Sequence, residues 1–156
     1  MHDTFESFSI CCEGDFFFSD SEYTSILYVR TPGGCFPSEG WTDFPETVLD
    51  WWVRELKRFF WGENGSYRLR FMDGPYEIRC ARKGERLTLS FLKYEAKTLP
   101  DCEVTLRELA QALNRAIETQ IRQLYLVGHS TRNMEDLHKE LSTVLPYIEK
   151  RVMNYD

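Results

Sequence analysis

The chain has 156 residues, of which 42% are hydrophobic and 28% are charged, and its formal net charge is −6. This length and composition are ordinary for a soluble globular protein and predict a single domain over residues 1–156. No run approaches the roughly 18 apolar residues of a membrane span, and the first residues lack a basic stretch, so we expect neither membrane insertion nor a signal peptide.

The charge is unevenly distributed along the sequence. Residues 1–50 contain ten acidic residues and one basic residue, Arg30, whereas residues 51–156 have a net charge of +3. Contact with nucleic acid requires Lys and Arg side chains, so the acidic first third argues against a nucleic-acid partner. It suits a basic protein partner, although acidic residues that only keep the surface soluble would produce the same composition.

The five cysteines predict a reducing compartment. Their number is odd, and none of them forms a C-x-x-C pair. Together with the absence of a signal peptide, this favours free thiols in the cytoplasm, where cysteine acts mainly as a small buried hydrophobic residue.

Alternating apolar and polar residues predict strands near the start of the chain. Phe5–Cys12 and Tyr23–Arg30 follow the period of two that is typical of a half-buried strand, and Phe16–Phe18 is a shorter candidate. Residues 31–40 hold two of the six prolines and three of the nine glycines, so we expect a loop there.

A helix is predicted over residues 44–61. Asp43 is the expected cap, and Glu46 stands where it would complete a capping box. Phe44 and Trp51 lie at the edge of the apolar face. The residues of that face follow the helical period: Val48, Leu49, Trp52, Val53, Leu56, Phe59 and Phe60.

Three strands are predicted next as a meander, at Tyr67–Met72, Tyr76–Ala81 and Arg86–Tyr94. Short turns containing Gly and Asp or Lys join them. Each strand alternates cleanly, so the sheet should have one apolar face and one polar face that bears arginines.

Two further helices are predicted over residues 105–127 and 133–153. Thr105 and Glu108 form a capping box for the first, and Pro146 should kink or split the second. Because strands and helices occur in separate runs, we predict an α+β fold, with an antiparallel sheet of about five strands and three helices packed on one face.

The sequence contains no recognisable catalytic or metal-binding motif. His2, His129 and His138 lack the spacing of metal ligands, and the segment around His129 does not match a nucleophile elbow. A Cys35 and His129 pair has no supporting motif. We therefore expect no enzymatic activity, no catalytic residue, no metal and no cofactor.

An interaction surface is predicted where acidic residues flank aromatic ones, because carboxylates steer a basic partner and a large aromatic side chain anchors it. Most aromatic residues of this region should belong to the core, but some should be partly exposed. The residues predicted to bind a partner are Glu39, Trp41, Asp43, Phe44, Asp50 and Trp51.

Three segments resemble small bacterial immunity proteins that are encoded beside polymorphic or contact-dependent toxins: residues 40–44, 48–52 and 71–76. The resemblance extends over about residues 40–125. It implies a cytoplasmic protein that binds its cognate toxin and blocks the toxin's active site or access to substrate. The acidic first third agrees with what the resemblance implies where the toxin is a basic nuclease.

Two other functions remain open from the sequence. An α+β ligand-binding or enzymatic domain could recognise an anionic small molecule through the arginine-bearing face, which contains Arg68, Arg70, Arg79 and Arg82. A structural or adaptor protein could self-associate through the aromatic helix. The identity of the partner and the oligomeric state are not predicted.

Overall fold

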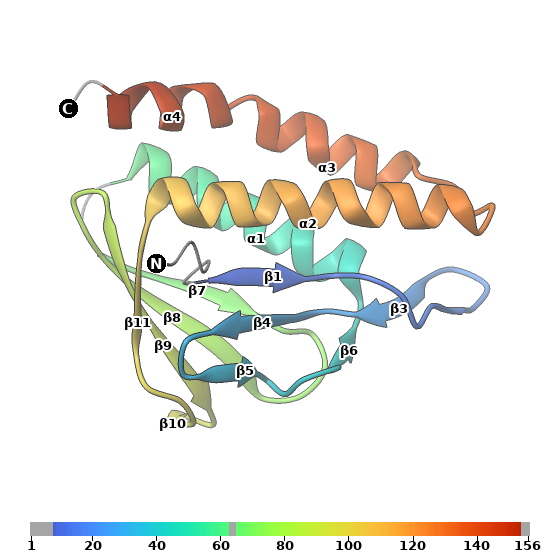
Figure 1. Cartoon of the computed structure of the whole chain (residues 1–156), viewed down its shortest axis with the longest axis horizontal. Coiled ribbons are helices and arrows are strands. Elements are labelled where there is room, and N and C mark those ends of the chain that lie inside the picture. The colour runs from blue at the N-terminus through green and yellow to red at the C-terminus, as the bar shows by residue number, and fades with distance from the viewer. Residues whose placement is uncertain (1–7, 63–64, 154–156) are drawn as a thin grey trace, which may run out of the picture.

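The computed structural model describes residues 8–62 and 65–153, and its helices lie on one side of a layer of strands (Figure 1). The protein is α+β. The helices are α1 (Pro45–Trp61), α2 (Leu106–Leu126), α3 (Arg132–Ser142) and α4 (Leu145–Met153). The strands are β1 (Ser9–Cys11), β2 (Phe17–Phe18), β3 (Tyr23–Ile26), β4 (Tyr28–Thr31), β5 (Gly34–Phe36), β6 (Thr42–Asp43), β7 (Gly65–Arg70), β8 (Tyr76–Lys83), β9 (Arg86–Lys93), β10 (Ala96–Lys97) and β11 (Cys102–Thr105). His2 and residues 5–7 of the expected first strand lie outside the described residues.

The largest sheet is antiparallel and contains β7 to β11. The predicted meander is confirmed as β7, β8 and β9, in which Tyr67 lies opposite Cys80 and Cys80 opposite Leu89. The other edge of β9 pairs first with β10 and then with β11. The sequence pattern does not predict β10 or β11, because two and four residues are too short to show a period.

The first third of the chain forms two further small sheets, so the expectation of one sheet of about five strands is wrong for this region. β4 pairs with β1 and β5, whereas β3 pairs with β2 and β6. The expected strand Tyr23–Arg30 divides at Leu27, a fully buried residue whose amide donates to the carbonyl oxygen of Trp41 at 2.8 Å. The hydrogen-bond ladder therefore changes partners at Leu27.

Part of the segment 31–40, which was expected to be a loop, is the strand β5, and it forms a tight hairpin with β4. The Thr31 hydroxyl accepts from the Gly33 amide at 3.1 Å and donates to the Gly34 carbonyl oxygen at 3.0 Å. Gly34 has a φ of 137°, which glycine adopts without steric cost. Two of the glycines that predicted a loop thus form the turn of a hairpin.

The extent of α1 and its buried face agree with the prediction. The predicted cap is wrong, since Phe44 is the N-cap residue and no side chain caps the helix. The Asp43 carboxylate instead accepts the amide of Phe44 at 2.8 Å. At the start of α2, the capping box of Thr105 and Glu108 is confirmed, with both reciprocal hydrogen bonds present.

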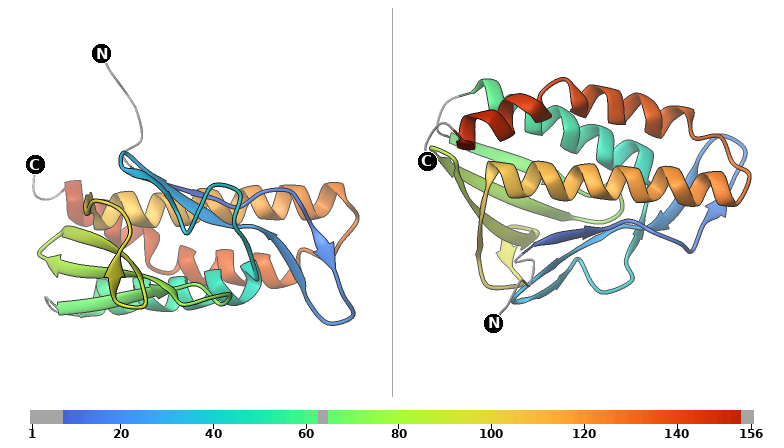
Figure 2. Two further views of the ribbon diagram at one scale, coloured as in Figure 1. Left: turned by 90° about the horizontal axis from the view of Figure 1, so that it is seen from below. Right: turned by 45° about the horizontal axis from the view of Figure 1, so that its top comes forward.

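The third predicted helix is present as α3 and α4, which separate at residues 143–144, just before Pro146. Pro146 is the second residue of α4, where an amide hydrogen is not required. α1 and α2 lie against the strands, whereas α3 and α4 pack mainly on α1 and α2 (Figures 1 and 2). The three predicted helices therefore do not all cover the sheet directly; the last of them forms an outer layer.

The buried apolar side chains form one core cluster between α1, α2 and the strands. All five cysteines are free, and Cys12, Cys80 and Cys102 are buried. Removal from water raises the pKa of the Cys12 thiol to about 12, so this side chain stays protonated and packs as a hydrophobic residue. Among the described helices, none combines the length and apolar character needed to cross a membrane.

Candidate functional site

Asp43, which was predicted to meet a partner, is instead buried, with 1% of its surface exposed. Its carboxylate accepts hydrogen bonds from the amides of Phe44 at 2.8 Å and Asp73 at 3.2 Å, and from Trp41 Nε1 at 3.1 Å. These bonds tie the segment before α1 to the turn between β7 and β8. Asp43 therefore positions the chain, and its carboxylate is not available to steer a partner.

Asp43→Ala should lower the free energy of unfolding by about 2 to 3 kcal/mol, because it leaves three partly buried donors without their acceptor. Urea unfolding followed by circular dichroism measures this loss. Asp50→Ala is the control, since Asp50 forms an ion pair with Arg54 at 3.0 Å on the surface, and such pairs contribute less than about 1 kcal/mol. Equal losses in the two variants would contradict the structural role of Asp43.

The other residues around the start of α1 that were predicted to bind a partner differ in their exposure. Trp41 is half-buried and meets the ring of Tyr76 edge-on, with centroids 5.0 Å apart. Phe44 is also half-buried. Glu39 is exposed, and its carboxylate lies 4.0 Å from the guanidinium of Arg30. Trp41 and Phe44 therefore keep part of their surface in solvent, and Glu39 is the most exposed of the three side chains.

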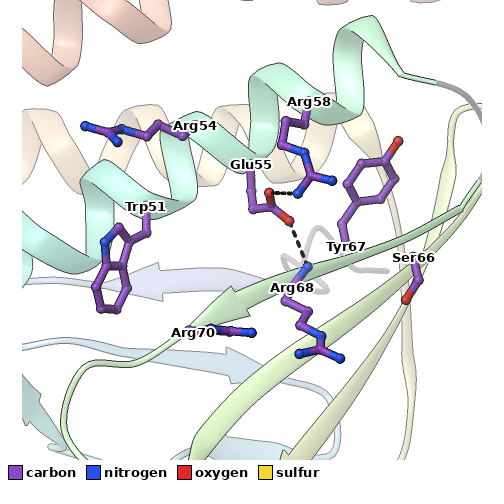
Figure 3. A pocket seen from close by; sticks show the side chains of 8 residues that line it. All are labelled: Trp51, Arg54, Glu55, Arg58, Ser66, Tyr67, Arg68 and Arg70. Atoms are coloured by element: carbon purple, nitrogen blue, oxygen red, sulfur yellow. Dashed lines mark hydrogen bonds and ion pairs between the residues drawn. The ribbon is translucent and has the colours of Figure 1, made fainter.

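Trp51 lies in a groove between α1 and β7 that has a volume of about 500 Å³ (Figure 3). Its side chain is 38% exposed. Asp50, at the margin, pairs with Arg54. We call this site the Arg–Trp groove; it is lined by Trp51, Arg54, Glu55 and Arg58 from α1 and by Ser66, Tyr67, Arg68 and Arg70 from β7.

The four arginines that were predicted to recognise an anion do not act together. Arg68 and Arg70 line the Arg–Trp groove. Arg79 is held by two glutamates at 2.9 Å, and Arg82 is buried and donates to the carbonyl oxygen of Gly84 at 2.8 Å. Two of the four predicted arginines therefore line the groove, together with Arg54 and Arg58 from α1.

A second surface is formed by residues 13–22 at one end of the molecule (Figure 1). This segment contains no Lys or Arg. Between its acidic residues, Phe17 and Phe18 are 70% and 42% exposed. The carboxylates are all on exposed residues: Glu13, Asp15, Asp20 and Glu22. The segment therefore combines negative charge with apolar side chains in water.

The C-terminal end of α2 lies beside this segment (Figures 1 and 2). Tyr125 is 77% exposed and Leu126 is 79% exposed, and Val127 follows them. The ring of Phe18 stacks on that of His129 with centroids 4.7 Å apart, which connects the two parts. We call the surface formed by residues 13–22 and 125–129 the acidic end.

Two glutamines of α2 hold the acidic end in place. Gln120 is fully buried, and its Nε2 donates to the hydroxyl groups of Tyr23 at 3.1 Å and Ser25 at 3.2 Å. Gln123 Oε1 accepts the amide of Gly14 at 2.6 Å. These hydrogen bonds attach the chain to α2 on both sides of the exposed phenylalanines, at Gly14 and at Tyr23.

The exposed apolar residues of the acidic end were not predicted from the sequence, although two signals were present. Phe16–Phe18 is an apolar run bounded by acidic residues, and residues 125–127 continue the apolar sequence beyond Leu124, the last residue of the buried stripe. Phe17 and residues 125–127 do not face the core, so their side chains are exposed.

Within residues 8–62 and 65–153, no group of three or more His, Cys, Asp and Glu side chains is arranged to hold a metal ion. No protein-family model, curated protein or solved structure matches the chain.

Proposed function

We propose that the protein is an immunity protein that binds a basic protein toxin through the acidic end. The observation that supports this function is the combination of exposed apolar side chains with surrounding carboxylates. Apolar patches with a charged rim are typical of interaction sites, and the carboxylates favour a partner rich in Lys and Arg. In this role the protein acts in the cytoplasm of the producing cell, by binding alone and without a cofactor.

The exposed side chains are suited to anchor such a contact. Phe17, Tyr125 and Leu126 are mostly in water, so a partner can bury them without disrupting the core. Burying a large apolar side chain contributes about 1.5 to 3 kcal/mol. The buried hydrogen bonds of Gln120 restrict movement of the supporting backbone, which lowers the entropy lost on binding.

The proposed surface differs from the one predicted around residues 39–51. Asp43 is buried, so its carboxylate cannot steer a partner, and the ring of Trp41 already contacts that of Tyr76. The acidic first third of the chain keeps its proposed role, through residues 13–22.

The test is Tyr125→Ala in a kinetic binding assay with the product of the neighbouring gene, inactivated by mutation, as ligand. We expect a loss of about 2 kcal/mol or more in affinity, about 30-fold, mainly through faster dissociation. Tyr94→Ala is the matched control, because Tyr94 is 75% exposed but lies outside the acidic end. Absence of binding at micromolar concentration, or equal losses in the two variants, would overturn the proposal.

A further inference from the structure

The Arg–Trp groove has no part in the proposed toxin contact, and it has an elongated form. Its α1 wall extends from Trp51 to Arg58, two turns along one helix face, or about 10 Å. Its β7 wall extends from Ser66 to Arg70, or about 13 Å of strand. Each wall carries two guanidinium groups along this length (Figure 3).

Positive charge is in excess in the groove. Glu55 is the one carboxylate among the lining residues, and it already accepts hydrogen bonds from Arg58 and from the amide of Arg68 at 2.9 Å. Within the described part of the chain, the Arg70 guanidinium has no hydrogen-bond or ion-pair partner. A ligand with several carboxylates would compensate this excess.

The remaining pairs at the groove are open to exchange. Arg54 pairs with Asp50 at 3.0 Å, and its side chain is 74% exposed. Arg68 lies 3.7 Å from Glu77 and is half exposed. Ion pairs in such exposed positions contribute little stability, so replacing them by contacts with ligand carboxylates costs little.

The backbone of β7 adds hydrogen-bonding groups, because β7 is an edge strand of its sheet. The Arg68 amide donates to Glu55 and not to β8. In an antiparallel ladder the backbone groups of Ser66 and Arg70, two residues away, then also point away from β8, although the Arg70 carbonyl oxygen already accepts from Trp52 Nε1. Glu55 shows how a carboxylate is held at this edge, by one amide and one arginine.

We propose that the Arg–Trp groove binds an extended acidic segment of a second protein, independently of the toxin contact at the acidic end. Carboxylates of the segment pair with Arg54, Arg68 and Arg70, and an apolar side chain packs on Trp51. The guanidinium groups are spread along both walls and do not converge on one point. This distribution favours an extended chain over a compact phosphate.

The experiment measures fluorescence anisotropy of a labelled octapeptide of glutamates with a central phenylalanine, at low ionic strength. The wild-type protein should bind the peptide, and added salt should weaken binding. Arg70→Glu should weaken binding about tenfold or more, because it removes a charge-assisted contact and adds a like charge. Tyr125→Ala should leave it unchanged, since the acidic end is a separate surface.

Arg132→Glu is the matched control, since it makes the same change in charge at an exposed residue of α3. Equal weakening by Arg70→Glu and Arg132→Glu would show that only net charge matters and would overturn the proposal. So would absence of binding at millimolar protein. Binding of inorganic pyrophosphate at Arg70 without binding of the peptide would make the groove a site for a compact anion instead.

Discussion

Replacing Trp52 with alanine should lower the free energy of unfolding by about 3 to 5 kcal/mol. The indole is 1% exposed, meets the ring of Phe71 edge-on at 5.3 Å, and donates from Nε1 to the carbonyl oxygen of Arg70 at 2.8 Å. The variant leaves a cavity between α1 and β7 and an edge carbonyl group without its donor. Chemical denaturation followed by far-UV circular dichroism measures the loss without relying on tryptophan fluorescence.

Trp51→Ala is the matched control, since it removes the same side chain one position earlier in α1. Trp51 is 38% exposed in the Arg–Trp groove, so its removal should cost less than about 1 kcal/mol. Losses of similar size in the two variants would contradict the structure, in which Trp52 faces the core and Trp51 faces the groove.

Reversing charge at the acidic end, with Asp20→Lys and Glu22→Lys together, should lower the association rate constant for the proposed toxin about tenfold at low ionic strength. Complementary charge accelerates encounter, and salt screens it, so the salt dependence should also flatten. Stopped-flow mixing at two or more salt concentrations measures both. Dissociation should change less, because apolar anchors such as Phe17 determine how long the complex lasts.

The control for this prediction is Asp136→Lys with Glu149→Lys, which changes the net charge by the same amount on α3 and α4. Both residues lie outside the acidic end. If this pair lowers the association rate as much as the variant at the acidic end, attraction depends on net charge alone, and the surface assigned to the toxin is wrong.

The elements that could be predicted from the sequence are those with a local pattern of residues. The apolar stripe of α1, the capping box at Thr105 and the three strands of the meander each repeat over enough residues to be recognised. The sheets of the first third could not be predicted, because their partners depend on distant contacts. The bond between Leu27 and Trp41 is one example, and it lies where β3 ends and β4 begins.

The candidate sites were less predictable than the fold, because the exposure of a side chain depends on which distant segments pack against it. Asp43 has the sequence context of a helix cap, yet its carboxylate accepts from its neighbours Trp41 and Phe44 and from Asp73 in a turn 30 residues away. Trp51 was correctly placed at the edge of the apolar face. Its neighbours Arg68 and Arg70 come from a strand that begins beyond the end of the helix, so the groove has no signature in the sequence.

The acidic end and the Arg–Trp groove carry local charges of opposite sign, an asymmetry that the net charge of −6 does not reveal. A charged partner therefore exerts a torque on the molecule as well as a pull. Within about 8 Å, the screening length at physiological ionic strength, the field turns the protein so that the matching surface faces the partner. Orientation before contact would allow a basic and an acidic partner to reach their own surfaces with few misdirected collisions.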